Sequence, residues 1–581
     1  MNQGTLLERG MALHRAGRLA EAERVYKEAL RQNPDDWRAH LSLGGAQLAQ
    51  RRISEALASF DATLALQPQC VDAHHGRGMA LQQLQRSAAA LASFDAALAL
   101  APQSAELCNS RGNALRRLQR LPEALASYER ALALQPQLAL AHSNRGLVLQ
   151  ALGRYRDAAE SYERALALQP NFAEAHNNLG AVQSELGEPA AALASYRRAL
   201  ELRPALTGAH GNLGNALRDL ERPAEALAEF ERALLEAPDS AVNHCHRGNA
   251  LFDLGRLRQA IAAYDRALEL EPRYAQAHFN KSVCLLLAGD LSQGLPLYEW
   301  RKELKGARAP QPAAPVWNGT QDLSGRTLFI YADQALGDTL QFCRYAQLAE
   351  RRGAHVILSV QPQLTELLSS LGGAIRIVSA AEPPPACDYQ SALLSLPLAF
   401  ATTLSDVPAS VPYLSPDPRR VAAWGERLGN AGFKVGIAWQ GSRHRIDVGR
   451  SVPLAMFAPL AAIPGVRLIS LQKEEEGAPG ELPLELPGRD FDAGSQAFLD
   501  TAALMQHLDL VITSDTAVAH LAGALGRPAW VALKYLPDWR WLLERSDSPW
   551  YPSLRLFRQS RIGDWDSVFT SIRRELETRA A

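Results

Sequence analysis

The stretch ALAHSNRGLVLQALGRYRDAAESYERALALQPNF, residues 139–172, is one of eight similar units that follow one another with a period of 34 residues. A fixed period of this length is typical of a solenoid built from paired helices. Proline lacks an N–H group and clashes with the preceding turn, so a proline in each unit is expected to end its second helix. The prolines are Pro34, Pro68, Pro102, Pro136, Pro170, Pro204, Pro238 and Pro272.

Three further positions repeat with the same period, and the quoted unit shows them as Gly146, Ala158 and Tyr162. The glycine lets two helices touch, because it has no side chain. The alanine opens the second helix where it crosses the first, and the aromatic residue is expected to fill the gap between neighbouring units. Glycine, alanine, aromatic residue and proline in this order resemble the tetratricopeptide repeat over residues 3–274. A ninth unit from Ala275 onward is degenerate.

Polar residues at the sixth position of the units predict a binding surface. As part of the first helix of each unit, they are expected to line the concave face of the solenoid. An amide offers donors and an acceptor, which suits an extended peptide backbone. The amides resemble the inner face of the protein O-GlcNAc transferase solenoid, which implies a polypeptide acceptor. A polar face copied by duplication is the alternative. The amides are Asn144, Asn178, Asn212 and Asn280.

Histidine recurs at the fourth position and accounts for seven of the fourteen histidines of the chain. Stacked units separate these rings by about 10 Å. Ligands must approach one metal ion to about 2 Å, so the rings cannot share it. We therefore expect helix-packing residues rather than a metal site. The histidines are His40, His74, His142, His176, His210, His244 and His278.

The composition argues against several classes of protein, namely those that bind nucleic acid, membranes or zinc and those built on disulfides. The formal net charge of −1 gives no overall field that would attract nucleic acid or an anionic membrane. The six cysteines are scattered without a C-x-x-C pair, which favours reduced thiols over a zinc site or a disulfide framework. The sequence has no apolar stretch typical of a signal peptide or a membrane span. We expect a cytoplasmic protein without membrane insertion, nucleic-acid partner or metal.

The 34-residue period stops near Lys305, and strands then alternate with helices. Two successive blocks of this alternation predict two Rossmann-like domains that face a cleft. The predicted domains are the solenoid at 1–308, a proline-rich linker at 309–325, an acceptor-side domain at 326–418 and a donor-binding domain at 419–581. The predicted strands are 327–332, 355–360, 375–378, 434–439, 466–471, 510–513 and 529–533. The predicted helices are 338–352, 363–371, 421–428, 454–463, 498–508, 517–525 and 564–577.

Two motifs follow predicted strands, where ligands of parallel sheets bind. In Gln334-Ala335-Leu336-Gly337-Asp338-Thr339, Asp338 is either a helix N-cap or a general base. The second motif, residues 514–524, contains Asp515, Thr516 and His520 at the start of a helix rich in small residues. Free N–H groups and the dipole of that helix would receive a phosphate.

Gly-Asp after the first strand and Asp-Thr-x-x-x-His-Leu-Ala in the second half resemble the heptosyltransferase-like glycosyltransferases of the GT-B fold. The segments 439–442, 470–472 and 537–541 resemble a subgroup that carries tetratricopeptide repeats and includes bacterial flagellin glycosyltransferases. This resemblance implies an α-helical solenoid followed by an α/β GT-B fold. It also implies an inverting, metal-independent transfer from a nucleotide sugar to a protein acceptor, with flagellin as one candidate and no cofactor.

The same resemblance implies roles for the motif residues. Asp338 would deprotonate the acceptor hydroxyl, while Asp515, Thr516 and His520 would hold the donor. A metal-free reaction needs protein cations at the leaving phosphate. Basic residues that follow strands of the second half are the candidates, and a solvated surface run is the alternative. These candidates are Arg443, His444, Arg445, Arg450, Lys473 and Lys534.

Two other functions remain open. A scaffold with a degenerate transferase half would explain why Ala332-Asp333-Gln334-Ala335 replaces the expected Gly-Glu-Gln-Gly. Two lost glycines make this loop less pliable, so the acceptor pocket is expected to differ. A transferase for lipid or oligosaccharide would use the solenoid only for docking. Four tryptophans near the C-terminus are expected in the core rather than at a ligand. They are Trp530, Trp539, Trp541 and Trp550.

Overall fold

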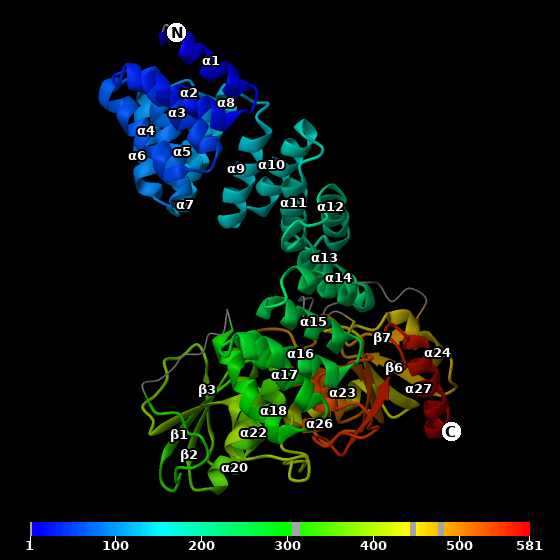
Figure 1. The fold of residues 1–581 in the computed structure, drawn as a ribbon. Coiled ribbons are helices and arrows are strands. Elements are labelled where there is room, and N and C mark those ends of the chain that lie inside the picture. The colour runs from blue at the N-terminus through cyan, green and yellow to red at the C-terminus, as the bar shows by residue number, and fades with distance from the viewer. Residues whose placement is uncertain (1–2, 305–313, 442–448, 474–481) are drawn as a thin grey trace. The chain divides into compact units, whose positions relative to one another are not determined.

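The computed structural model describes residues 3–304, 314–441, 449–473 and 482–581. It contains two compact units, Met1–Pro238 and Asp239–Ala581, which are considered separately. Figure 1 shows helices throughout the first unit and two sheets in the second. The expected order, a helical solenoid followed by an α/β region with parallel sheets as in the GT-B fold, is confirmed.

The first unit consists of helix pairs, one pair for each 34-residue repeat. The quoted stretch forms one such pair, and its second helix ends two residues before Pro170. Gln169, which precedes the proline, has φ of −137° and ψ of 85°, as the proline requires of its neighbour. The helices are α1 (Gln3–Arg15), α2 (Leu19–Gln32), α3 (Trp37–Ala49), α4 (Ile53–Leu66), α5 (Val71–Gln83), α6 (Ser87–Leu100), α7 (Ala105–Arg117), α8 (Leu121–Leu134), α9 (Ala139–Ala151), α10 (Tyr155–Leu168), α11 (Ala173–Glu185), α12 (Pro189–Leu202), α13 (Ala209–Asp219) and α14 (Pro223–Glu236).

The recurring glycine and aromatic residue contact each other inside one repeat. A Cβ atom on Gly146 would lie 2.7 Å from Cε1 of Tyr162, so a side chain would displace the ring. Tyr162 is buried and also clusters with Leu179 and Val182 of the next repeat. The aromatic residue therefore packs within its repeat as well as filling the predicted gap between repeats.

The recurring histidines join consecutive repeats. His142 Nε2 lies 2.9 Å from the carbonyl oxygen of Pro136, and His40, His74, His176 and His278 make the same bond to the proline six residues earlier. His210 differs, because its Nδ1 lies 2.6 Å from a carboxylate oxygen of Glu229. These rings are structural residues, as predicted, and the bond to the proline carbonyl is the reason for their position.

The second unit begins with two further helix pairs. They are α15 (Ala241–Asp253), α16 (Leu257–Leu270), α17 (Ala275–Leu287) and α18 (Leu291–Tyr298), and the 3-10 helix η1 (Glu299–Glu303) follows them. Leu286, Leu295 and Tyr298 from the last pair belong to the same hydrophobic core as Leu328 and Val511 of the two sheets. The last repeats and the α/β region thus share one core.

The α/β region contains two parallel sheets, with strand orders β3-β2-β1-β4 and β10-β9-β8-β5-β6-β7. Their strands are β1 (Thr327–Tyr331), β2 (His355–Val360), β3 (Arg376–Ser379), β4 (Tyr389–Ala392), β5 (Phe433–Ala438), β6 (Val466–Ser470), β7 (Leu484–Glu485), β8 (Leu510–Ser514), β9 (Ala529–Leu533) and β10 (Leu554–Arg558). The helices are α19 (Leu336–Phe342), α20 (Arg344–Arg351), η2 (Pro362–Leu364), α21 (Thr365–Leu368), η3 (Ser369–Leu371), η4 (Leu393–Ser395), α22 (Leu396–Ala399), α23 (Pro418–Leu428), η6 (Leu454–Phe457), α24 (Ala458–Ala461), α25 (Leu499–Met505), α26 (Ala517–Ala524), η7 (Trp539–Trp541) and α27 (Trp565–Ala580).

One predicted helix, 338–352, is in fact two helices that meet at Cys343. At this break, side-chain donors form hydrogen bonds to the backbone carbonyl groups. Leu340 O accepts from the Tyr413 hydroxyl at 2.8 Å, and Gln341 O accepts from Arg344 Nε at 2.9 Å. Three strands, β4, β7 and β10, were not predicted; β10 pairs with β9 in parallel.

Candidate functional site

The helices that follow β1 and β8 pack directly against each other. A Cβ atom on Gly337 of α19 would lie 3.0 Å from Cδ2 of His520 and 3.5 Å from Cα of Ala517, both on α26. The glycine therefore permits the close approach of the two helices. The structure thereby brings together the two motifs singled out from the sequence, which come from different sheets.

Asp338 lies at this junction. It is the third residue of α19, whose N-cap is Ala335, so the N-cap interpretation was wrong. Its Oδ2 accepts a hydrogen bond from the backbone N–H of Ala335 at 3.1 Å, and its Oδ1 accepts one from Arg540 Nη2. Its side chain remains 19% exposed. Burial raises the pKa of Asp338, although the guanidinium of Arg540 opposes this shift.

Arg540 links two carboxylates. It lies in η7, after β9, and its side chain is 6% exposed. Nη2 donates to Asp338, and Nη1 donates to Asp538 Oδ1 at 2.8 Å. The guanidinium also lies over the rings of Phe342 and Trp539. Burial works against its charge, but the two carboxylates outweigh burial and raise its pKa.

Asp515 marks the end of β8 and is only 8% exposed. Its Oδ1 accepts from Trp541 Nε1 at 2.8 Å, while its Oδ2 accepts no hydrogen bond from the described residues. Arg450 is near, with Nε 3.7 Å from that Oδ2 and Nη2 3.8 Å from Asp538 Oδ2. Burial raises the pKa of Asp515, and Arg450 opposes this. The buried hydroxyl of Ser514 likewise lacks a hydrogen-bond partner among the described residues.

His520 is a buried, neutral residue. Its ring stacks on Trp541 at 5.3 Å between centroids, and its Nδ1 lies 3.2 Å from the Tyr551 hydroxyl. Burial lowers its pKa to about 3, and the nearby Arg540 adds to this effect. Thr516 is the N-cap residue of α26, and its hydroxyl lies 3.1 Å from that of Thr513. At neutral pH His520 can therefore hydrogen bond to a ligand but carries no positive charge.

Sequence models of known families match both halves of the chain. Tetratricopeptide-repeat models match residues 7–70, 71–104, 112–153, 149–187, 173–206, 207–240 and 246–299. The helical units are tetratricopeptide repeats. Residues 491–533, which include Asp515, Thr516 and His520, match glycosyltransferase family 9 (heptosyltransferase).

Protein FlbA of Caulobacter vibrioides (strain ATCC 19089 / CIP 103742 / CB 15) is 31% identical to this chain over 295 residues. The match covers 46% of this chain and 48% of FlbA, so the chain spans about half the length of this curated relative. Among solved structures, the repeats resemble YrrB, described as a TPR protein with an unusual peptide-binding site. The two sequences are 27% identical, and the match covers 32% of this chain and 95% of the YrrB chain, with a TM-score of 0.29. Pseudomonas aeruginosa pilF is 20% identical and covers 36% and 94%, with a TM-score of 0.33.

The predicted amides of the tetratricopeptide repeats bond to neighbouring repeats. Asn144 is buried, and its Nδ2 donates to Asn109 Oδ1 at 2.9 Å. The equivalent bond of Asn212 goes to Asn177 at 3.2 Å, whereas Asn280 in the second unit bonds to Asn249, at another position of the preceding repeat, at 2.7 Å. Asn178 is half-buried. These amides therefore have a structural use that the sequence pattern did not reveal, because their partners lie 31 or 35 residues away.

The predicted cations are not all near the family 9 motif. Arg450 lies beside Asp515, whereas Arg443, His444 and Arg445 lie outside the described residues. Lys473 is exposed after β6, and Lys534 is half-buried after β9. The four tryptophans of the C-terminal region are buried, as predicted. Arg540, the central cation, was not predicted, although its segment Pro-Asp-Trp-Arg-Trp was noted.

The described residues contain neither a helix suited to crossing a membrane nor a cluster of metal-ligating side chains. No helix there combines the length and apolar character that crossing a membrane requires. No group of three or more His, Cys, Asp or Glu side chains is placed there to hold a metal ion.

Proposed function

We propose that the α/β region transfers a sugar from a nucleotide-sugar donor to a polypeptide acceptor that the tetratricopeptide repeats hold. The family 9 match at residues 491–533 supports the reaction class. The observation that carries the proposal is a cluster that joins Asp338, in the helix after β1, to Asp515, directly after β8. The residues that link them are Arg540, Asp538 and Arg450. Ligands of parallel sheets bind at the carboxyl ends of the strands.

In this proposal Asp338 is the general base. The acceptor hydroxyl gives its proton to the Asp338 carboxylate while its oxygen attacks the anomeric carbon. The bond between that carbon and the donor phosphate breaks on the opposite face, so the configuration inverts. Burial, which raises the pKa of Asp338, makes the carboxylate a stronger base, and Arg540 keeps it oriented.

The leaving phosphate needs positive charge where it departs. The first backbone N–H groups of α26, close to Asp515, have no partner within the helix, and the side chain of the N-cap residue Thr516 does not bond to them. Arg450, whose side chain is 24% exposed, lies close enough to contribute a cation. The unpartnered Ser514 hydroxyl and Asp515 Oδ2 could bind hydroxyl groups of the donor. These groups would replace a metal ion in stabilising the transition state.

The acceptor side of the proposal rests on the repeats. At the sixth position of its repeats this chain resembles the acceptor-holding solenoid of protein O-GlcNAc transferase, and three of the four amides there also bond to a neighbouring repeat. Because the sequence resembles transferases that modify flagellin, flagellin is the first acceptor to test. Such a reaction would take place in the cytoplasm, before the acceptor leaves the cell.

The test is thermal unfolding of the full-length chain against a panel of nucleotides and nucleotide sugars. A ligand that binds the native state at about 100 times its Kd adds about 2.7 kcal/mol of stability, which raises the midpoint clearly. We expect one nucleotide class to stabilise the protein and Asp515→Ala to abolish the shift. Asp564→Ala, which removes the N-cap side chain of α27 outside the cluster, is the control and should leave the shift intact.

Transfer is then assayed with the stabilising donor and purified flagellin, using intact-protein mass spectrometry. An increase by the mass of one sugar residue supports the proposal. A well-folded protein that binds none of the nucleotides would overturn it in favour of the scaffold. Donor turnover with oligosaccharide but without any protein acceptor would restrict the repeats to a docking role.

A further inference from the structure

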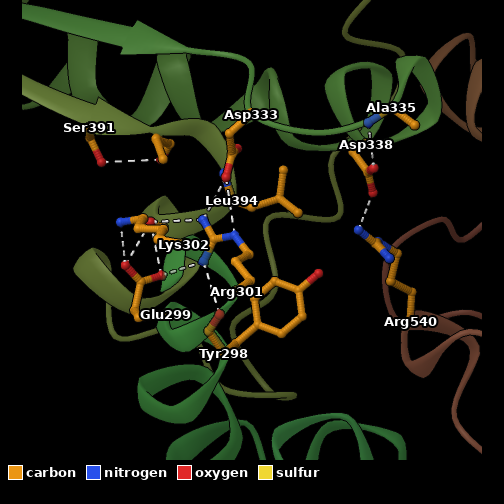
Figure 2. A network of polar contacts seen from close by, with 12 residues as sticks. Tyr298, Glu299, Arg301, Lys302, Asp333, Ala335, Asp338, Ser391, Leu394 and Arg540 are labelled. Carbon is orange, nitrogen blue, oxygen red and sulfur yellow. Dashed lines mark hydrogen bonds and ion pairs between the residues drawn. The ribbon is translucent and has the colours of Figure 1, made fainter. Parts of the chain in front are cut away.

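The last tetratricopeptide repeat ends in a buried arginine that reaches the loop after β1. Arg301 lies in η1, and its side chain is 3% exposed. Its Nη2 and Nε donate to Asp333 Oδ2 at 2.8 and 3.1 Å, and its Nη1 donates to Glu299 Oε1 at 2.7 Å (Figure 2). Nη2 also donates to the hydroxyl of Ser395 at 3.0 Å. All the directions of this guanidinium are thus occupied by fixed partners.

Asp333 connects this arginine to two strands. It follows β1 by two residues, and its Oδ1 accepts from the backbone N–H of Leu394, which follows β4, at 3.3 Å. Its side chain is 8% exposed, so the ion pair with Arg301 is almost fully buried. Charge-assisted bonds of an arginine fork fix orientation as well as distance. Arg301 therefore fixes the start of the loop that leads to α19.

The other end of the same loop carries Asp338. It lies five positions after Asp333 in the sequence, and Arg540 holds its carboxylate. One more contact holds the middle, because Gln361 Nε2 donates to Gln334 O at 2.7 Å. The loop is therefore held by the last repeat at its start, by the segment after β2 in its middle and by η7 at its end.

Tyr298 brings the same repeat next to the candidate base. Its ring lies below the guanidinium of Arg301 at 5.0 Å and meets Trp539 edge-on at 6.0 Å between centroids. In Figure 2 its hydroxyl is turned toward the side of Asp338 and Arg540. Burial raises its pKa to about 12, so it is a neutral phenol at that position. Through Tyr298, the last repeat thus forms part of the surroundings of Asp338.

We propose that Arg301 is a positioning residue: through its ion pair with Asp333, the last tetratricopeptide repeat places Asp338 for proton transfer. This inference rests on the proposed function for the role of Asp338. A displacement of about 1 Å at a reacting group costs about 100-fold in rate, so a loop held at both ends matters for catalysis. The repeats then contribute to the reaction itself in addition to holding an acceptor.

The experiment uses the full-length chain with Arg301→Gln, Asp333→Asn and the double variant. Arg301→Gln leaves the buried carboxylate of Asp333 without its charged partner and is expected to destabilise the fold generally. Asp333→Asn is expected to be milder, because Arg301 keeps its ion pair with Glu299. The double variant removes both charges and should recover most of the unfolding midpoint while lacking the charged bond. Hydrogen exchange of the backbone amides at 333–338 is the first readout, and the amide of Ala335, bonded to Asp338, is its most direct reporter.

Two further variants calibrate this readout. Gln361→Met removes the bond to Gln334 O and should raise exchange in the same loop. Asp492→Ala removes a buried carboxylate that accepts from Asp500 N–H and Thr501 N–H, so it lowers stability without touching the loop. Exchange at 333–338 in this second variant should match the wild-type protein once global unfolding is subtracted.

In the double variant we expect exchange at 333–338 to rise about tenfold or more, with β2 unchanged, and kcat to fall about 10- to 100-fold at a nearly constant donor KM. Unchanged exchange, or raised exchange with unchanged kcat, would overturn the inference. A wild-type chain that turns over no donor would overturn the proposed function instead. The exchange data would then still decide whether Arg301 holds the loop.

Discussion

The imidazole of His520 lies against the backbone of Gly337, so that a single added carbon on the glycine would come within 3.0 Å of the ring. The two residues are 183 positions apart and follow strands of different sheets. Through this contact the two motifs that carry the candidate chemistry pack directly against each other. It ties the position of Asp338, the next residue along α19, to that of α26.

Gly337→Ala is expected to force α19 and α26 apart. The extra carbon meets the buried ring of His520, whose position is already set by stacking on Trp541 and by the contact of Nδ1 with the Tyr551 hydroxyl. Overpacking of this kind costs about 1–3 kcal/mol of unfolding free energy, measured by urea denaturation. Gly45→Ala is the control, because its nearest neighbour lies at an ordinary 3.5 Å, and should be neutral or stabilising. Equal stability of both variants would contradict the contact.

His520 is expected to make stability fall in mild acid. Its folded pKa, about 3, lies below the ordinary value of 6.5, so the unfolded chain takes up the proton first. The neutral His520 ring therefore contributes its full share to the free energy of unfolding above pH 6.5. This share falls as the pH is lowered, by about 2 kcal/mol between pH 6.5 and 5. Denaturation of wild type and His520→Gln at several pH values isolates this effect, since both share all carboxylates. Parallel curves for the two proteins would show that His520 is not a buried neutral ring.

Asp338→Asn is expected to abolish turnover but to leave binding of the donor nucleotide intact. The amide cannot accept the proton of the acceptor hydroxyl, so kcat is expected to fall by about 100- to 10,000-fold. The donor groups near Asp515 are unchanged, and the thermal shift with the donor nucleotide should persist. Asp564→Asn, at the start of α27, is the matched carboxylate control. Turnover within tenfold of the wild-type rate would exclude Asp338 as the base.

Replacing the sixth-position amides of the solenoid should affect stability to different degrees, depending on whether the amide bonds to a neighbouring repeat. Asn144→Ala deletes the donor to Asn109 and leaves a buried oxygen unpaired, which costs about 1–3 kcal/mol. Asn178→Ala, at the half-buried equivalent position one repeat later, should change stability by less than about 0.5 kcal/mol. Chemical denaturation of the two variants makes the comparison. A reversed order would mean that the amide bond at Asn144 contributes little.

Much of the fold follows from the sequence because its signals are local. The 34-residue period places both helices of each repeat, and apolar runs such as Thr327–Tyr331 predict buried parallel strands. β10 was missed since its sequence, Leu-Arg-Leu-Phe-Arg, includes an exposed and a half-exposed arginine, as suits a strand at the edge of a sheet.

The candidate site was predictable only where its residues follow strands. Asp338 and Asp515 were found in this way, because a polar residue after an apolar run is visible in the sequence. Arg540 and Arg301 were not, since each acts on a carboxylate 202 or 32 residues away and looks like an ordinary surface cation by itself. Burial turns such cations into fixed partners, and burial at this level depends on the packing of distant segments.

The bond that five of the seven repeating histidines make to the proline six residues earlier spans the junction between two repeats. Both ends of the bond are therefore copied whenever a stretch of 34 residues is duplicated or deleted in frame. Repeats can therefore be gained or lost in evolution, and the new junction already has the hydrogen bond that joins its two repeats. The reach of the repeats can then change, to suit longer or shorter partners, while the α/β region stays as it is.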